Sequence, residues 1–338
     1  MHFFKEMKEK RHINIHRRII LLSSLLSLLF TNCIKDDVPV IAHVPGDIQT
    51  VQIEIGYPYT YQVYYNCETN SVVNTNTKYD WDLSFECTQN GNHILLNTAK
   101  GMLACNSGSS IFDNVSDTIG STWLWDAPSG NLDSTAVNNW QGSNNIYIVD
   151  RQYDENGNHM GYKKIQFQSV NNQNYTFKFA DLNGNNEVTY TIQKNQNLNF
   201  IHFTFDNGGQ TLVLEPNKNE WDLLFTNHHH KFSNLPLPFV LTQVLSNKHN
   251  DVIIAEDNNN SFSTIELKDS INYIFTDIWD EIGYDWKIRN SQDNSFTIDA
   301  NKSFILKTTN GFFYKIRFID FYNNTGVKGY PTFEIQKL

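Results

Sequence analysis

Hydrophobic and polar residues alternate along most of the chain after residue 50. Val51, Ile53 and Ile55 alternate with Gln52 and Glu54. Because side chains of a β-strand point to opposite faces in turn, this period of two predicts strands with one buried face. The pattern returns at Tyr59–Tyr65, Ile146–Val149, Tyr162–Phe167, Tyr175–Phe179, Val188–Ile192, Phe200–Phe205, Thr211–Leu214, Phe304–Leu306, Tyr314–Phe318 and Thr332–Ile335.

Short runs rich in Asn, Gly and Asp separate these segments. Examples are Glu155–Asn158, Asn183–Asn185, Asn207–Gly209 and Asn310-Gly311. Such residues tolerate the backbone angles of tight turns, so each run predicts a hairpin connection. The fold class predicted is all-β, with antiparallel, hairpin-rich sheets and at most short helices.

The chain also repeats part of its own sequence. Tyr79–Phe85 (YDWDLSF) matches Asn219–Phe225 (NEWDLLF), and Tyr162–Phe167 (YKKIQF) matches Tyr314–Phe318 (YKIRF). Two matches in the same order indicate two related β-units. We assign residues 51–215 to the first β-unit and residues 216–338 to the second.

The first 32 residues differ from everything that follows. A basic head with six Lys and Arg residues precedes the uncharged run Ile19–Phe30. This is the pattern of a signal peptide, and the run of 12 residues is short for a transmembrane anchor, which needs roughly 20. Leu28–Asn32 before Cys33 resembles a lipobox, in which the Cys becomes the acylated first residue, although Asn32 departs from the usual small residue.

The residues after Cys33 carry a second export signal. Ile34-Lys35-Asp36-Asp37 resembles the short signal that directs lipoproteins of Bacteroidetes-type bacteria to the outer face of the outer membrane. Residues 33–50 lack periodicity and contain Pro39, Pro45 and Gly46, which is typical of a flexible tether. We therefore expect a lipid-anchored protein of the outer membrane, exposed on the cell surface.

Charge and cysteine content narrow the set of partners. The formal net charge is −10, and because residues 1–32 contribute +4, the remaining chain carries −14. Nucleic acid is excluded as a partner because it requires a basic footprint. Cys67, Cys87 and Cys105 are an odd number without a CxxC motif, which indicates buried thiols, or one disulfide with one thiol left over.

A set of aromatic motifs is densest near the C-terminus: Ile282–Lys287 (IGYDWK), Phe312–Tyr322, Gly326, Lys328–Pro331 and Phe333, together with the Trp-Asp-Leu-x-Phe segments at 81 and 221. With these motifs the chain resembles the HmuY family, surface lipoproteins of which several bind haem. The resemblance covers most of residues 51–338. It implies an all-β fold, a lipid anchor, haem as ligand and a TonB-dependent receptor as partner. Taken alone, core aromatics identify a fold and not a ligand.

The family's haem ligands are His or Met residues ahead of the Tyr-Asp-Trp-Lys motif and in the loop behind it. In this sequence neither Ser263–Trp279 nor Ile288–Asn294 contains His or Met. Other imidazoles are candidates, because haem iron needs axial ligands such as His or Met. His228 and His230 share one face of a predicted strand and are candidates for haem or a metal ion, with His249 as a further haem ligand. The alternative is a solvated polar stretch before Phe232.

Two weaker candidates lie in predicted hairpin turns. His159 and Met160 place both ligand types side by side, but the repeat aligns them with an ordinary turn. Asp181–Glu187 has oxygen-bearing side chains at alternating positions, as in calcium loops, and is interpreted as a hairpin turn.

The sequence contains no nucleophile elbow, zinc-protease motif or phosphate loop, so we interpret the protein as non-enzymatic. The favoured function is binding of haem, free or from haem proteins, or of a related porphyrin for uptake through an outer-membrane receptor. The alternative is a structural or adhesion-type surface lipoprotein of the same fold that contacts glycan or protein.

Overall fold

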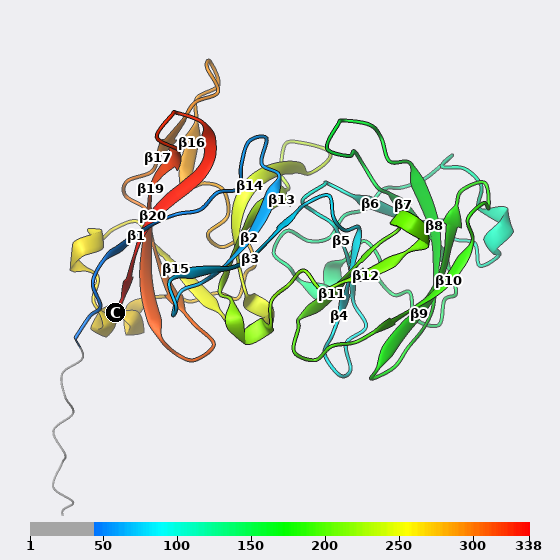
Figure 1. The fold of residues 1–338 in the computed structure, drawn as a ribbon, viewed down its shortest axis with the longest axis horizontal. Coiled ribbons are helices and arrows are strands. Elements are labelled where there is room, and N and C mark those ends of the chain that lie inside the picture. Colours follow the sequence, from blue (N-terminus) through cyan, green and yellow to red (C-terminus); the bar gives the residue numbers. More distant parts are fainter. Residues whose placement is uncertain (1–43) are drawn as a thin grey trace, which may run out of the picture. The chain divides into compact units, whose positions relative to one another are not determined.

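The computed structural model describes residues 44–338, and these residues are mainly antiparallel β-sheet (Figure 1). The only helices among them are short 3-10 turns, and the longest has six residues: Phe112–Asn114 (η2), Leu132–Ser134 (η3), Asp206–Gly208 (η4), Lys218–Glu220 (η5), Lys248–Asn250 (η6), Phe262–Thr264 (η7) and Leu267–Asn272 (η8). No helix within residues 44–338 is long and apolar enough to cross a membrane. The predicted all-β class is confirmed. Cys33 and the predicted signal peptide, residues 1–32, lie outside the described residues.

The strands from β4 to β12 form two sheets around one core, and we call this part half A. One sheet has the order β10 (Val188–Gln193), β9 (Asn174–Asp181), β8 (Tyr162–Val170), β7 (Ile146–Asp150), β6 (Leu103–Asn106). The other has the order β12 (Gln210–Leu212), β11 (Phe200–Thr204), β4 (Leu83–Glu86), β5 (Ile94–Leu96). Side chains from both sheets, such as Phe85 and Phe177, stack in the shared core.

The remaining strands form a second pair of sheets, which we call half B. One has the order β1 (Gln49–Gln52), β20 (Lys328–Lys337), β19 (Phe313–Tyr322), β18 (Ser303–Lys307), β15 (Ile253–Asp257). The other has the order β14 (Phe239–Ser246), β13 (Leu223–His230), β2 (Tyr61–Asn66), β3 (Ser71–Thr77). Phe225 and Phe333 stack between them, as Phe85 and Phe177 do in half A. A further hairpin, β16 (Lys287–Arg289) and β17 (Phe296–Ile298), projects from half B (Figure 1).

The two halves have the same strand order, with one difference in how the chain runs. Each strand of β12-β11-β4-β5 has a counterpart in β3-β2-β13-β14, and each strand of β10-β9-β8-β7-β6 has one in β1-β20-β19-β18-β15. Half A is continuous, whereas half B takes β1 to β3 from before half A and its other strands from after it. The sequence interpretation assigned residues 51–77 to the first β-unit, and the division at 215/216 remains a proposal. Strand β2, which lies within residues 51–77, pairs in its sheet with β13 of half B.

Three features predicted from sequence have clear places in these sheets. Cys67, Cys87 and Cys105 are free, buried thiols. Asp181–Glu187 forms the β9–β10 turn, where Asp181 pairs with Lys163 at 2.5 Å. The end of the predicted tether is held by half B, because the Gly46 amide donates to the Lys337 carbonyl and β1 pairs with β20.

Candidate functional site

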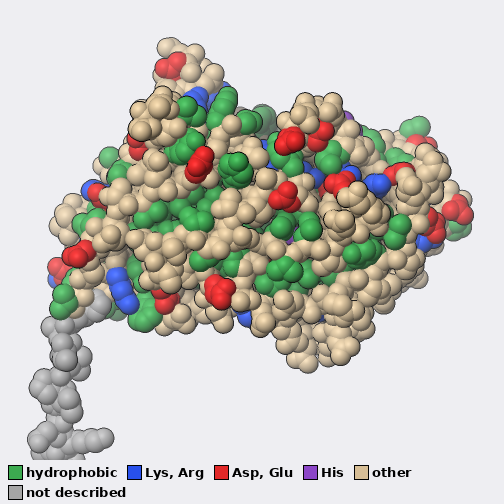
Figure 2. All heavy atoms as spheres, viewed as in Figure 1, with side chains coloured by type: hydrophobic (Ala, Val, Ile, Leu, Met, Phe, Trp, Pro, Cys, Tyr) green, Lys and Arg blue, Asp and Glu red, His purple; other side chains and the backbone are tan. Residues whose placement is uncertain are grey.

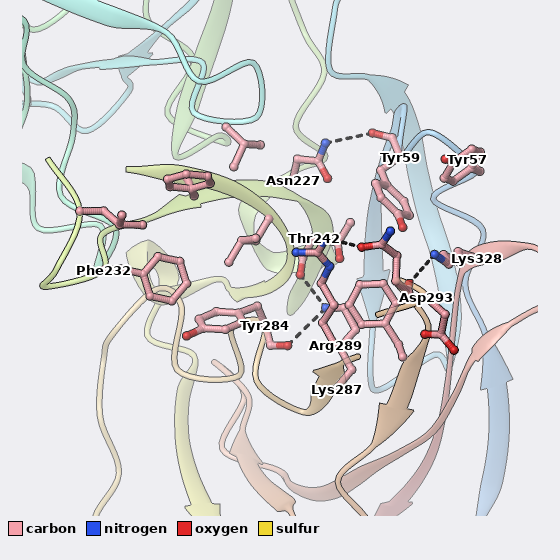
Figure 3. Close-up of a pocket in the computed structure, with 16 residues that line it drawn as sticks. Tyr57, Tyr59, Asn227, Phe232, Thr242, Tyr284, Lys287, Arg289, Asp293 and Lys328 are labelled. Atoms are coloured by element: carbon pink, nitrogen blue, oxygen red, sulfur yellow. Dashed lines mark hydrogen bonds between the residues drawn. The ribbon is translucent and has the colours of Figure 1, made fainter. Parts of the chain in front are cut away.

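A cavity with a volume of about 890 Å³ lies in half B. We call it the aromatic pocket. It is bounded by the β13–β14 connection, the loop before β2, the β16–β17 hairpin and the start of β20 (Figure 3). Its lining is Tyr57, Tyr59, Asn227, Phe232, Leu235, Phe239, Val240, Leu241, Thr242, Tyr284, Lys287, Arg289, Asp293, Asn294, Phe296 and Lys328. This size and an apolar wall with few polar groups are typical of small-molecule sites.

Several of the wall aromatics are exposed to an extent unusual for such side chains. Tyr57 is 66% exposed and Phe239 is 52% exposed. Phe232 contacts both Tyr284 and Phe239, with ring centroids 5.9 and 6.4 Å apart, and Tyr57 meets Tyr59 edge to face at 5.6 Å. A contiguous exposed apolar surface in a hollow indicates a binding site for an apolar or aromatic partner.

The charged groups of the pocket are mainly cationic. Lys287 is buried at its floor, while Arg289 and Lys328 are more exposed (Figure 3). Arg289 donates to the Asn294 side chain and Lys328 to the Asn294 carbonyl. Asp293 is the one acidic residue of the lining. Three cations against one carboxylate give the lining a net positive charge. Acidic side chains are dispersed over the face of the molecule shown in Figure 2.

Burial shifts the pKa of two groups in the pocket. It raises the pKa of Tyr59 to about 12, assisted by Tyr57 and Tyr322, so the phenol is protonated at neutral pH. It lowers the pKa of Lys287 to about 7, because the ammonium is removed from water. Asn227 donates to the Tyr59 carbonyl at 3.2 Å, while its own buried side-chain oxygen has no hydrogen-bond partner among residues 44–338.

The structure places His228 away from the pocket, in the contact between β13 and loops of half A. His228 is fully buried, with Nδ1 2.7 Å from the Thr98 hydroxyl and Nε2 3.0 Å from the Pro128 carbonyl. Because a carbonyl only accepts, Nε2 must donate to it and Nδ1 must accept from Thr98. In this conformation His228 has no lone pair available for a metal, and burial lowers its pKa to about 3.

The other predicted imidazoles do not converge with His228 on a common point. His230 borders the pocket, with its ring 4.7 Å from the rings of both Tyr284 and Phe232. His249 is half-buried beside Phe200 and Trp279. Within residues 44–338, no three His, Cys, Asp or Glu side chains lie together as metal ligands. The assignment of His228, His230 and His249 to haem, and of the first two to a metal, remains a prediction.

His159 and Met160 lie in the β7–β8 hairpin of half A. His159 Nε2 is 3.0 Å from the Asp150 carboxylate, and the Met160 sulfur is 3.8 Å from the Lys100 ammonium. His159 thus has a partner at the end of β7, whereas the partner of Met160 lies 60 residues earlier in the chain. Their role as weaker ligand candidates remains a prediction.

Sequence reasoning did not identify the pocket residues as a site. Lys287 ends the Tyr-Asp-Trp-Lys motif, whose aromatics we interpreted as core, and the segment Phe232–Phe239 (FSNLPLPF) was not considered. A run of apolar residues with two prolines between two strands is a signal that could have been used, because such a run cannot continue the sheet and its apolar side chains need another partner.

Comparison with known proteins identifies the family of the chain. Among solved structures, it resembles apo PinO from Porphyromonas gingivitis (10% identity, 86% of this chain and 97% of that chain, TM-score 0.30). It also resembles the apo HmuY analog of Tannerella forsythia (11% identity, 87% of this chain and 98% of that chain, TM-score 0.24). A third structure, from Bacteroides vulgatus, is described as a putative HmuY-like haem-binding protein (16% identity, 51% of this chain and 90% of that chain, TM-score 0.23). No curated protein matches the sequence. The sequence profile of the HmuY protein family matches residues 58–335, and the chain therefore belongs to the HmuY family.

Proposed function

We propose that this protein is a non-enzymatic, surface-anchored lipoprotein that binds a porphyrin, haem included, in the aromatic pocket for uptake through an outer-membrane receptor. The observation that carries the proposal is the pocket itself: aromatic walls around a hollow of about 890 Å³ with a cationic floor and rim. A porphyrin is a flat aromatic ring with two carboxylates, so its ring suits the walls and its carboxylates suit Lys287, Arg289 and Lys328.

The fit is good for the ring and poor for the iron. No His, Met or Cys belongs to the lining formed by residues 44–338. The lining contains the phenols of Tyr57, Tyr59 and Tyr284, and a tyrosine phenolate can ligate haem iron, but a Tyr59 pKa of about 12 opposes formation of the phenolate. His230 lies outside the lining and packs on Tyr284 and Phe232. The proposal therefore assigns recognition to the ring and its carboxylates rather than to axial ligands.

The same lack of His and Met in the described lining favours the second candidate, a surface lipoprotein that does not bind haem and contacts glycan or protein. Exposed Tyr57 and Phe239 would then form part of a contact surface. A porphyrin titration separates the two candidates, because only the first predicts saturable binding of a free porphyrin.

The test is titration of the mature chain with haemin and with metal-free protoporphyrin IX, followed by absorbance and tryptophan quenching. We expect both to bind, and the double variant Tyr57→Ser/Phe239→Ser to bind about tenfold more weakly, since an aromatic contact contributes about 0.5–1.5 kcal/mol. Tyr153→Ser is the matched control, because Tyr153 is equally exposed, at 54%, but lies in half A. Absence of binding by the wild type at micromolar porphyrin would favour the glycan or protein contact.

A further inference from the structure

Lys287 is a buried cation whose hydrogen-bonding capacity is only partly used. Its side chain lies at the pocket floor and the residue is 6% exposed. Nζ donates to the Thr242 carbonyl at 2.8 Å and to the Tyr284 carbonyl at 3.3 Å (Figure 3). An ammonium has three N–H groups, so one donor has no hydrogen-bond partner among residues 44–338.

The surroundings of this ammonium contain rings instead of a counter-ion. Nζ lies 4.3 Å from the centroid of Trp286 and 5.1 Å from that of Phe321. No carboxylate of residues 44–338 lies within ion-pair distance of Lys287 Nζ. The adjacent Asp285 pairs instead with Lys302, at 2.8 Å. Burying a charge without a partner is costly, and the cost is recovered when an anion binds.

The two other cations of the pocket differ from Lys287 in their exposure and in their hydrogen-bond partners. Arg289 and Lys328 are more exposed and are held by Asn294 at the end of the β16–β17 hairpin. Exposed cations attract anions in general, with little discrimination and strong screening by salt. Lys287 is the one whose position and spare donor select a particular group.

We propose that Lys287 is the carboxylate-recognition residue of the aromatic pocket, and that the ligand is a flat aromatic acid whose carboxylate accepts the remaining Lys287 N–H. The proposal rests on the proposed function and deepens it: the acid group of the porphyrin, and not its metal, decides affinity. It predicts that a porphyrin with esterified carboxylates loses the interaction at Lys287 while its ring still fits the walls.

The experiment compares protoporphyrin IX with its dimethyl ester on the full mature chain by tryptophan quenching. The wild type should bind the acid at least about tenfold more tightly, as expected for a hydrogen bond between charged partners. Lys287→Met should abolish this preference and leave ester affinity within about twofold, while Lys287→Arg should retain most of it. Lys163→Met, which removes a cation of half A outside the pocket, should leave the preference unchanged. A preference that persists in Lys287→Met would overturn the assignment.

A measurement on the wild type keeps the proposal testable if Lys287→Met does not fold. The low Lys287 pKa, about 7, is caused by burial and is opposed only by the charge of Asp285. At pH 8 the free amine is mostly neutral, so binding of the acid should take up close to one proton, and binding of the ester none. Calorimetry in buffers of different ionisation enthalpy measures this uptake. Equal uptake for acid and ester would refute the role of Lys287, whereas no binding of either porphyrin would refute the proposed function and this inference together.

Discussion

The Asp of the Trp-Asp-Leu motif lies just before equivalent strands in half A and half B, β4 and β13. The two aspartates differ in the charged groups around them. Asp82 donates its amide to the Phe203 carbonyl and Asp222 donates its amide to the Tyr65 carbonyl, on equivalent neighbouring strands. Asp82 pairs with Lys100 at 2.6 Å and Arg151 at 2.8 Å. Those cations hold the Asp82 pKa below its usual value against burial. Burial raises the pKa of Asp222, which has no such partner among residues 44–338, to about 6.

The β4–β5 and β13–β14 connections are equivalent loops of the two halves, but they differ in length and polarity. The cavities beside them differ as well. In half A the β4–β5 connection is short and polar: the Gly91 carbonyl accepts from the Tyr175 hydroxyl and the Lys194 ammonium. The hollow beside it has about 350 Å³ and is lined mainly by polar groups around Trp140. In half B the β13–β14 connection is longer and apolar and borders the aromatic pocket. One scaffold thus holds two different cavities because loops, and not the sheets, line them.

The largest effect that we expect in this comparison comes from the two aspartates. Asp82→Asn leaves the buried Lys100 without a counter-charge and leaves Arg151 with only the partly exposed Asp206, so it should lower the free energy of unfolding by about 3–5 kcal/mol. Asp222→Asn removes no ion pair, and its amide oxygen can still accept from the Cys67 amide, so its cost should be about 1 kcal/mol or less. Urea denaturation at pH 7.5 measures both. Similar costs would mean that the ion pairs of half A contribute no net stability.

A second pair of substitutions should affect the halves equally. Lys164 donates to the Phe112 and Val115 carbonyls, and Lys315 donates to the Phe262 and Ile265 carbonyls, all at 2.7–3.0 Å. Each replacement by Met leaves two buried carbonyls without a donor and should cost about 1–3 kcal/mol.

The control for these substitutions is Lys163→Met, which breaks a partly exposed pair with Asp181 and should cost at most about 1 kcal/mol. Guanidinium denaturation measures the free energy of unfolding of Lys164→Met, Lys315→Met and Lys163→Met. A cost seen in only one half would contradict the structural equivalence of the two lysines.

The smallest effect that we expect is a pH dependence of the unfolding free energy, caused by a histidine found only in half A. His202 packs on Trp81 at 4.6 Å where Tyr64 packs on Trp221 in half B, and burial lowers the His202 pKa to about 3. Unfolding restores the pKa to about 6.5, so the unfolded state binds more protons between these values and stability falls as the pH drops below 6.5.

From pH 7.5 to pH 5.5, His202 alone should therefore remove about 1.4 kcal/mol of the unfolding free energy. His202→Phe should lose that part of the pH dependence, and the difference between wild type and variant isolates it from other buried acids and imidazoles. Parallel stability curves for the two proteins over this range would disprove the assignment.

Sequence patterns by themselves determined the all-β class, many of the strands and turns, and the family of this protein, because period-two alternation and core aromatics are local properties of the chain. They did not predict strands such as β3, β5 and β6. They could not determine that β2 pairs with β13, since alternation along Tyr61–Tyr65 predicts a buried face but not the strand beside it. Nor could they show that His228 is satisfied by Thr98 and Pro128, 130 and 100 residues away. The aromatic pocket was decided only by tertiary structure, because its walls come from four separate segments whose side chains meet after the sheets of half B have formed.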